Sequence, residues 1–223
     1  MNATSVNYGG TYTFPSNSFT APSNKHFTAW AWDGVNGTQY APSATIGNIT
    51  AAHTAYAIWA YDTYAIGYNA NGGTGDGPAA SFKTKTYGTA LTLPNASQAG
   101  FTKTGHHLNY WRVGSAASTT TIALGGTYTT NSATTMYADW SPDTYTLTYT
   151  NGGVSGVEGS GPAARFKTKT YGTDLTLPTA SQAGYTRSYY VLGGWQVQLN
   201  ATSTVIDAGG AYTYNEAATL IPS

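Results

Sequence analysis

The sequence contains no cysteine, and only 8% of its 223 residues are charged, against about 25% in ordinary globular proteins. The lack of cysteine excludes disulfides, thiolate catalysis and zinc–thiolate centres. The formal net charge is zero and the nine lysines and arginines are scattered, so the basic stripe that nucleic-acid binding requires is missing. We therefore expect neither a nucleic acid nor an anionic membrane as a partner.

Long apolar runs are also missing. No run approaches the roughly 20 residues that span a bilayer, so we expect no membrane span in this segment. The first ten residues, MNATSVNYGG, carry no basic stretch and no apolar stretch of the kind that forms a secretory signal. If the protein is secreted, we expect the signal to have been removed from this sequence.

Threonine, serine, asparagine, glycine and tyrosine take the place of the missing charges, which predicts a neutral, polar surface. Five N-x-[ST] sequons occur, and such motifs are N-glycan acceptors in surface loops of secreted proteins. A chain rich in these residues also produces sequons by chance. The candidate N-glycan acceptors are Asn2, Asn36, Asn48, Asn95 and Asn200.

The chain repeats itself. Residues 82–101 read FKTKTYGTALTLPNASQAGF, and 17 of these 20 positions are identical in residues 166–185. A catalytic site needs one copy, whereas a module that stacks or chains needs several. An earlier, more divergent copy aligns through Trp30, which lies 81 positions before Trp111. We predict an incomplete first repeat at 1–60, a second at 61–141 and a third at 142–223.

Within a repeat the apolar period is two. Tyr145, Leu147 and Tyr149 share one face of an extended segment, and threonines occupy the other, which is typical of a half-buried strand. Glycine-rich turns follow, and the LPNASQAGF stretch suits a single 3₁₀ turn. No segment carries an amphipathic helix pattern over three turns, so a mainly β fold is expected.

The pattern YxLxYxxNGG … YGTxLTLPxAxxxGY … W … TMYAxW resembles the Listeria–Bacteroides repeat, also called the internalin B-repeat, over nearly the whole chain. The resemblance implies tandem, small β-grasp-like modules in a linear array, mainly β with an α+β leaning, on a microbial surface protein. It implies no chemistry. The spacer after the NGG turn is longer here, and the residues after the middle tryptophan depart from the family pattern.

The residues that could act in catalysis or bind a metal do not form a recognisable site in the sequence. His106 and His107 are paired, but zinc takes three or four ligands and no carboxylate lies near them in sequence. Asp62 and Asp143 occupy equivalent repeat positions and are interpreted as turn formers, rather than as paired glycosidase carboxylates. The segment Gly72–Pro78 lacks the phosphate-loop pattern. We expect no catalytic residue, no cofactor and no metal.

The tryptophans recur with the repeat, which favours a role as core anchors. Exposed aromatic rings that stack on glycans are the alternative. Trp32 aligns with Val113 and Val197 and is expected to be buried. The predicted repeat core anchors are Trp30, Trp59, Trp111, Trp140 and Trp195.

The lysines of the two FKTKT segments alternate with threonine, so we expect both lysines of each pair on one solvated strand face. The alternative is an intramolecular Lys–Asn isopeptide crosslink of the kind known in other surface adhesins. Such a crosslink needs a buried acid, and few acids remain. The four residues are Lys83, Lys85, Lys167 and Lys169.

The first repeat lacks the opening DTYTLTYTNGG-type strand, and the third lacks its closing tryptophan. Either the chain is a piece of a longer array, or the first module has a vacant strand position that a neighbour fills. Repeated head to tail, that contact yields a filament. Both interpretations remain open.

We therefore predict a non-enzymatic, extracellular structural protein of a microbial cell surface, acting as a stalk or spacer or as a filament subunit. Its partners are then copies of itself or neighbouring repeats of a longer chain. The alternative is an adhesin module that binds a glycan or a surface protein.

Overall fold

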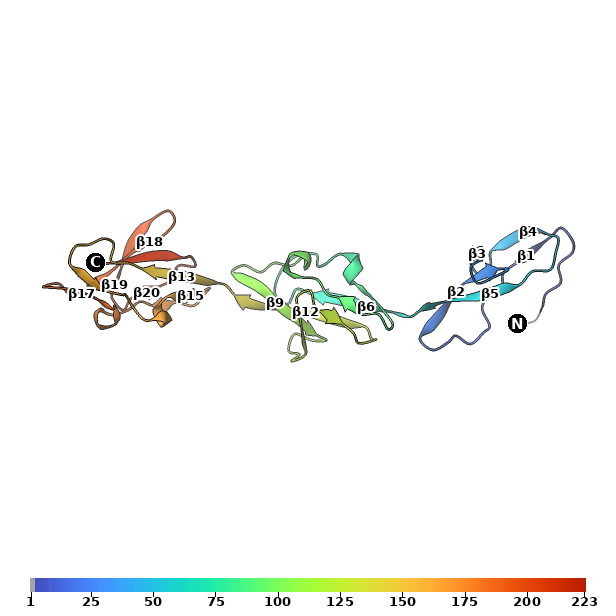
Figure 1. The fold of residues 1–223 in the computed structure, drawn as a ribbon, viewed down its shortest axis with the longest axis horizontal. Coiled ribbons are helices and arrows are strands. Elements are labelled where there is room, and N and C mark those ends of the chain that lie inside the picture. The colour runs from blue at the N-terminus through green and yellow to red at the C-terminus, as the bar shows by residue number, and fades with distance from the viewer. Residues whose placement is uncertain (1–2) are drawn as a thin grey trace.

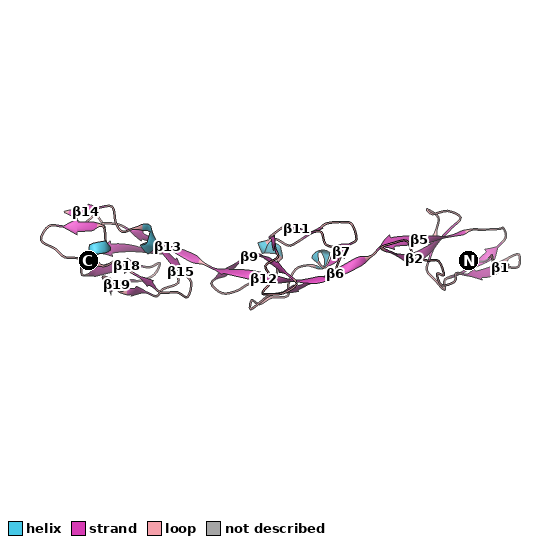
Figure 2. Ribbon diagram, turned by 90° about the horizontal axis from the view of Figure 1, so that it is seen from below, coloured by secondary structure: helices cyan, strands magenta, loops and turns pink. Residues whose placement is uncertain are grey.

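The computed structural model describes residues 3–223 and shows three β modules that follow one another in a line (Figure 1). The line persists when the molecule is turned by 90° (Figure 2). Strands dominate, and the only helical elements among the described residues are 3₁₀ turns of three residues each. The prediction of a mainly β fold built from tandem repeats is confirmed. The β-grasp likeness stays a prediction.

The second module is built on a five-stranded mixed sheet in the order β10-β9-β12-β6-β7. The closing strand β12 lies between the opening strand β6, to which it is parallel, and β9, to which it is antiparallel. A small antiparallel pair of strands, β8 and β11, lies beside this sheet. The elements are β6 (Thr63–Asn69), η1 (Ala80–Phe82), β7 (Thr84–Thr86), β8 (Leu91–Thr92), η2 (Ala96–Gln98), β9 (His106–Val113), β10 (Thr121–Ala123), β11 (Thr127–Tyr128) and β12 (Thr134–Pro142).

The third module repeats this arrangement, with a main sheet in the order β15-β13-β21-β18-β19. Its opening strand β13 is again parallel to its closing strand β21. Two small antiparallel pairs, β14 with β17 and β16 with β20, complete it. The elements are β13 (Thr144–Tyr149), β14 (Val157–Gly159), η3 (Ala164–Phe166), β15 (Thr168–Thr170), β16 (Leu175–Thr176), η4 (Ala180–Gln182), β17 (Tyr185–Arg187), β18 (Gly194–Gln198), β19 (Ser203–Asp207), β20 (Ala211–Tyr212) and β21 (Ala218–Pro222).

The first module has fewer strands. Its sheet has the order β3-β2-β5, and β1 pairs with β4 beside it. By repeat position β2 corresponds to β9 and β5 to β12, so this sheet stops where the opening strand and its neighbour would follow. The elements are β1 (Gly10–Thr13), β2 (Lys25–Trp32), β3 (Gln39–Tyr40), β4 (Thr45–Ile49) and β5 (Ala55–Tyr61).

Each module closes around one tryptophan of the middle strand. Trp30, Trp111 and Trp195 are at most 1% exposed. Each indole Nε1–H donates to the carbonyl of a proline, Pro15, Pro94 or Pro178, at 2.8–2.9 Å. A buried indole needs such an acceptor, because an unpaired donor in a core costs about 1–3 kcal/mol. The Trp–Pro bond therefore fixes how the turn after the LTLP-type segment lies on the sheet.

Trp59 and Trp140, on the closing strands, are only partly buried. Trp140 Nε1–H donates to Ala70 O at 2.8 Å, which ties the closing strand to the turn after β6. Trp32, expected to be buried, is also only partly covered. Trp32 is the last residue of β2, the middle strand of the first module's sheet.

The expectation that both lysines of each FKTKT segment share a solvated face is wrong. Lys85 is 1% exposed and Lys169 is 0% exposed, whereas Lys83 and Lys167 are exposed. The physical reason is that Lys83 and Lys167 end the turns η1 and η3. Strand alternation starts only at the following threonine, so the second lysine of each pair points inward.

Single aspartates join the modules. Asp62 N–H donates to Asn24 O of the first module at 2.9 Å, and Asp62 O accepts from Tyr87 N–H of the second at 2.8 Å. Asp143 repeats both bonds, with Gly105 O and Tyr171 N–H, at 2.8 Å each. These bonds hold each joint from both sides.

Candidate functional site

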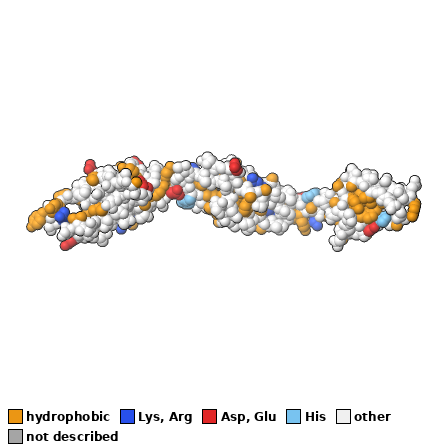
Figure 3. Space-filling model, turned by 90° about the horizontal axis from the view of Figure 1, so that it is seen from above, with side chains coloured by type: hydrophobic (Ala, Val, Ile, Leu, Met, Phe, Trp, Pro, Cys, Tyr) orange, Lys and Arg blue, Asp and Glu red, His pale blue; other side chains and the backbone are white. Residues whose placement is uncertain are grey.

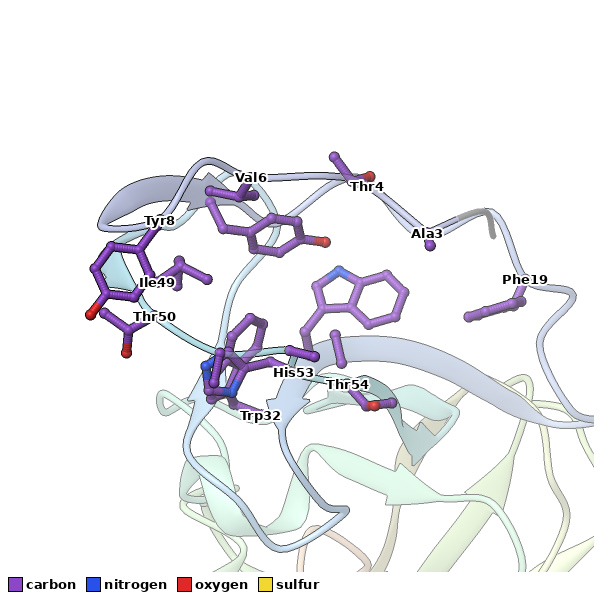
Figure 4. A pocket seen from close by; sticks show the side chains of 15 residues that line it. Ala3, Thr4, Val6, Tyr8, Phe19, Trp32, Ile49, Thr50, His53 and Thr54 are labelled. Carbon is purple, nitrogen blue, oxygen red and sulfur yellow. The ribbon is translucent and has the colours of Figure 1, made fainter.

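Hydrophobic side chains gather in a patch on the first module in the view of Figure 3. This module also contains a groove with a volume of about 700 Å³. Its two walls and its floor come from different parts of the module, and Figure 4 shows the side chains that line it. We take this groove as the candidate functional site.

The N-terminal segment forms one wall. Ala3, Thr4, Val6 and Tyr8 line the groove, and Figure 4 shows the first three along one side of it. The backbone N–H groups of residues 3–8 donate no hydrogen bond to any other described residue. Tyr8 is 86% exposed. This wall is therefore a segment without a strand partner.

The repeat register identifies that segment. Pro15 and Pro94 accept equivalent tryptophan bonds and lie 79 positions apart. The same offset places residues 5–7 on Thr84–Thr86, which is β7. In the second module β7 pairs with the opening strand β6. The wall is thus the β7 equivalent, and within residues 3–223 it pairs with no strand.

The opposite wall runs from Ile49 through Ala55 at the start of β5. β5 pairs with β2 along its inner edge, with Ala55 opposite Trp32. Asp33 N–H donates to Thr54 O at 2.8 Å. Because backbone polar groups alternate in direction along an antiparallel pair, those of Ala55 face the groove.

The floor of the groove is aromatic. Tyr12, Phe19, Trp30 and Trp32 line it, and Trp32 stacks on His53 with ring centroids 4.7 Å apart. A floor of this kind offers apolar area and ring faces.

Asp33 fixes the rim of the groove. Its carboxylate accepts from Thr54 N–H at 3.0 Å and lies 2.6 Å from His53 Nδ1. The hydrogen bond from Thr54 N–H, followed by that from His53, lowers the pKa of Asp33 below its usual value. Each of the two carboxylate oxygens of Asp33 therefore has a partner close by in the first module.

The complete modules show what normally occupies this place. In the second module the opening strand β6 lies between β7 and β12. Its Ile66 is 2% exposed, and its Tyr68 ring meets Trp111 edge-on at 5.1 Å. In the third module Leu147 and Tyr149 of β13 do the same, with Tyr149 4.9 Å from Trp195. The groove lies where the opening strand runs in the second and third modules.

Burial raises the pKa of Tyr68 and Tyr149 well above the usual range for tyrosine. The folded state therefore holds these protons to a higher pH than the unfolded chain, whose tyrosines ionise near pH ~10. It follows that the stabilisation is fully present below about pH 10 and is lost as pH rises above it. We expect Tyr68→Phe to flatten this alkaline loss for the second module.

The measurement is the urea midpoint of the parent and of Tyr68→Phe at about pH 8 and about pH 11. At the lower pH the variant loses only the bond from Tyr68 Oη–H to Phe82 O, which is 3.1 Å long and worth about 1 kcal/mol. If the urea midpoint falls by the same amount between the two pH values in both proteins, the burial of Tyr68 is not a cause of the alkaline loss of stability.

In the second and third modules a buried lysine donates hydrogen bonds to an asparagine side chain and to a backbone carbonyl, an arrangement that we call the lysine clasp. Lys85 Nζ donates to Asn131 Oδ1 at 2.8 Å and to Thr86 O at 2.9 Å. Lys169 makes the same two bonds with Asn215 and Thr170, at 3.0 and 2.8 Å. In the first module the equivalent positions hold Val6 and Thr50, both in the groove lining. The first module therefore lacks the clasp.

Sequence reasoning missed three His–Asp pairs. His26 lies 3.1 Å from Asp62 and His107 lies 2.9 Å from Asp143, while His53 contacts Asp33. Both joint pairs span 36 positions and recur 81 positions apart. That shared spacing was the signal that could have found them. The interpretation of Asp62 and Asp143 as turn formers is wrong, because each is a one-residue link between two consecutive strands and not part of a turn.

His106, the other member of the sequence pair, donates from Nδ1 to Thr104 O at 2.8 Å, and its ring lies edge-on to the Tyr171 ring. Among residues 3–223, no group of three His, Cys, Asp or Glu side chains could hold a metal ion. Four of the five sequons are exposed, at Asn36, Asn48, Asn95 and Asn200. Their glycosylation stays a prediction, and Asn2 lies outside the described residues.

No helix within residues 3–223 is both long and apolar enough to cross a membrane. No curated protein and no solved structure matches the chain. The profile of the Listeria-Bacteroides repeat domain, by contrast, matches residues 64–139 and 145–221. These two matches fall on the second and third modules and cover more than half of the chain. The repeat is typical of surface proteins, and the chain belongs to the Listeria-Bacteroides repeat domain family.

Proposed function

We propose that the chain is a non-enzymatic structural element on the outside of a microbial cell. It acts as a stalk or spacer, or as the subunit of a filament whose neighbours complete each other's strands. The family supports a surface location, because these repeats are typical of surface proteins.

The observation that carries the proposal is the construction of the joints. Each joint is a single aspartate that hydrogen-bonds backbone groups of both flanking modules and a histidine of the preceding one. At the second joint a side chain on Gly105 would overlap the Tyr171 ring, so the modules approach closely there. Short, bonded joints keep modules in line (Figure 1), which a spacer requires.

The filament form draws on the groove of the first module. Unpaired backbone groups on two facing walls are a template for a strand from another chain. The surface carries little charge, so repulsion between copies is small.

Negative-stain electron microscopy of the purified chain across a concentration series tests the proposal. We expect straight particles with three beads in a row. Filaments that lengthen with concentration select the filament form, and isolated rods at every concentration select the spacer form. Compact particles, with the modules folded back on one another, would contradict both.

An adhesin is the alternative function. The observation that favours it is the aromatic floor of the groove, since aromatic rings stack on sugar rings and apolar side chains. A glycan array that detects saturable binding to the parent chain would select this alternative over a passive spacer.

A further inference from the structure

We propose that Tyr61 and Tyr87 are a site of oxidative crosslinking, at which a dityrosine bond closes the joint between the first and second modules. The oxidant is hydrogen peroxide acting through a haem peroxidase. This modification goes beyond the proposed function, and it applies to a spacer and to a filament subunit alike. The site lies well inside the chain, between two modules that follow each other directly.

The two tyrosines face each other across the joint. Tyr61 is the last residue of β5, and Tyr87 directly follows β7. Their ring centroids are 6.2 Å apart and their ring planes differ by 19°, so the rings stack. The bond from Tyr87 N–H to Asp62 O, 2.8 Å long, sets the spacing of the two backbones. The fold therefore keeps the two rings next to each other.

An oxidant in solution can reach this pair. Tyr61 is 51% exposed, and Tyr87 is partly buried. Lys25 Nζ lies 4.6 Å from the centroid of the Tyr61 ring, a cation–π contact that helps to hold this ring in place. Exposed side chains rotate within picoseconds to nanoseconds. Such rotation can bring the edges of two neighbouring rings into contact once both have been oxidised.

The reaction needs nothing from the protein except the two phenols. Each phenol loses one electron and its hydroxyl proton and becomes a phenoxyl radical. The two radicals join through the ring carbons next to their C–O bonds, which forms one carbon–carbon bond. The hydrogen on each of these carbons then moves to the phenol oxygen and restores the aromatic ring. Hydrogen peroxide accepts the two electrons and the two protons and becomes two molecules of water.

A second tyrosine pair in the described part of the chain is less accessible. The ring centroids of Tyr212 and Tyr214 are 5.4 Å apart, but Tyr212 is 0% exposed and its hydroxyl donates to Glu216 O at 2.8 Å. Burial, followed by the charge of Glu216, raises the pKa of Tyr212 to about 12. Because Tyr212 is covered and holds its proton tightly, we expect coupling at Tyr61 and Tyr87 instead.

The second joint has only one of the two tyrosines. Tyr171 is equivalent to Tyr87, and its N–H makes the equivalent bond to Asp143 O. Pro142 takes the position of Tyr61, and the neighbour of the Tyr171 ring is His106, which lies edge-on to it. This joint has no second phenol with which Tyr171 could couple. The chain therefore contains its own negative control.

The crosslink closes a loop around the start of the second module. Residues 62–86, which include β6, η1 and β7, lie between the two tyrosines. The molecule is thin at this joint (Figure 3). The sequence has no cysteine, so a disulfide cannot reinforce the joint, whereas a dityrosine needs no thiol. A crosslink also reduces the freedom of the unfolded chain, which favours the folded state.

The test treats the full chain at low concentration with hydrogen peroxide and a haem peroxidase. We expect the blue fluorescence of dityrosine in the monomer and an intact mass that is lower by two hydrogen atoms. After unfolding and digestion with trypsin, residues 26–83 and 86–103 should be joined, and Tyr87 is the only tyrosine in the second of these peptides. A monomer that forms no dityrosine, or forms it only between other residues, would overturn the proposal.

Three variants identify the coupled residues. Tyr61→Phe and Tyr87→Phe keep both rings and remove one phenol, so each change should abolish the joined peptides. Tyr56→Phe is the matched control, because Tyr56 is 41% exposed and lies on the same strand and in the same tryptic peptide as Tyr61. We expect this control to couple as the parent does. Joined peptides at the parental yield in Tyr61→Phe would show that Tyr61 is not the coupled residue.

Two further measurements distinguish a bond that closes the joint from random coupling. The yield per chain should not fall on dilution, because both tyrosines belong to one chain. The crosslinked chain should melt at least about 5 °C above the untreated parent, and Tyr61→Phe treated in the same way should show no such rise. A yield that falls with dilution, or a crosslinked chain with an unchanged melting temperature, would contradict the closed joint.

Discussion

Replacing Trp195 by alanine is expected to lower the free energy of unfolding of the third module by about 3–5 kcal/mol. Trp195 is fully buried at the centre of the cluster that contains Leu147, Leu177 and Leu220. The substitution removes this packing, leaves a cavity and deprives Pro178 O of its indole donor. A loss of this size is a large fraction of the stability of a small domain.

Peptide-resolved hydrogen exchange measures the effect, because it reports the third module separately from the other two. The matched control is Val205→Ala on the neighbouring strand β19, where Val205 is 62% exposed and pairs with Gln196. We expect this control to change stability by at most about 0.5 kcal/mol. Equal losses for Trp195→Ala and Val205→Ala would show that the tryptophan is not the anchor of the module.

Much of this module could be predicted from the repeat. Trp111 and Trp195 recur in step with Pro94 and Pro178, and a residue pair that keeps its spacing in two copies points to a shared contact. The alternation of Leu147 with threonines predicted which face of β13 is buried. Local patterns of this kind can be recognised in the sequence because they depend only on residues that are close together in the chain.

Non-local pairing could not be predicted. The parallel contact of β6 with β12 joins residues about 68 positions apart, and no local pattern encodes it. The lysine error has a local cause, because the 3₁₀ turn at Ala80–Phe82 delays the start of strand alternation. The pattern of apolar residues does not mark that delay.

The groove of the first module could be predicted only in part. The missing opening strand was predicted from the sequence as one of two interpretations, but its walls were not. Val6 is equivalent to Lys85, yet the two residues share no chemistry. Only the shared Trp–Pro bonds, which anchor Pro15 to Pro94, reveal that residues 5–7 form the β7 equivalent.

Asn131→Ala is expected to destabilise the second module by about 2–3 kcal/mol. Asn131 Oδ1 accepts from Lys85 Nζ and from Gly88 N–H. Its removal leaves the nearly fully buried Lys85 with Thr86 O as its remaining acceptor. An ammonium that loses an acceptor away from water costs more than a neutral donor does.

Lys85→Met is the matched comparison, and we expect it to cost less than Asn131→Ala. Methionine keeps much of the lysine stem volume and removes the buried charge, while Asn131 Oδ1 keeps the bond from Gly88 N–H. Removing one partner of a buried polar pair is costly mainly when the other partner is left without a hydrogen bond, and Asn131 Oδ1 is not left so. Urea unfolding of the two variants, with hydrogen exchange to locate the change, ranks them.

A larger loss for Lys85→Met than for Asn131→Ala would contradict this account and would mean that the lysine contributes a net favourable charge interaction. The intact mass of the parent chain adds a further check. A covalent Lys–Asn amide would lack one ammonia per bond, and its formation needs an acid to move protons. Among the described residues no carboxylate lies within ion-pair distance of Lys85 or Lys169, so we expect the unmodified mass and a clasp held by hydrogen bonds.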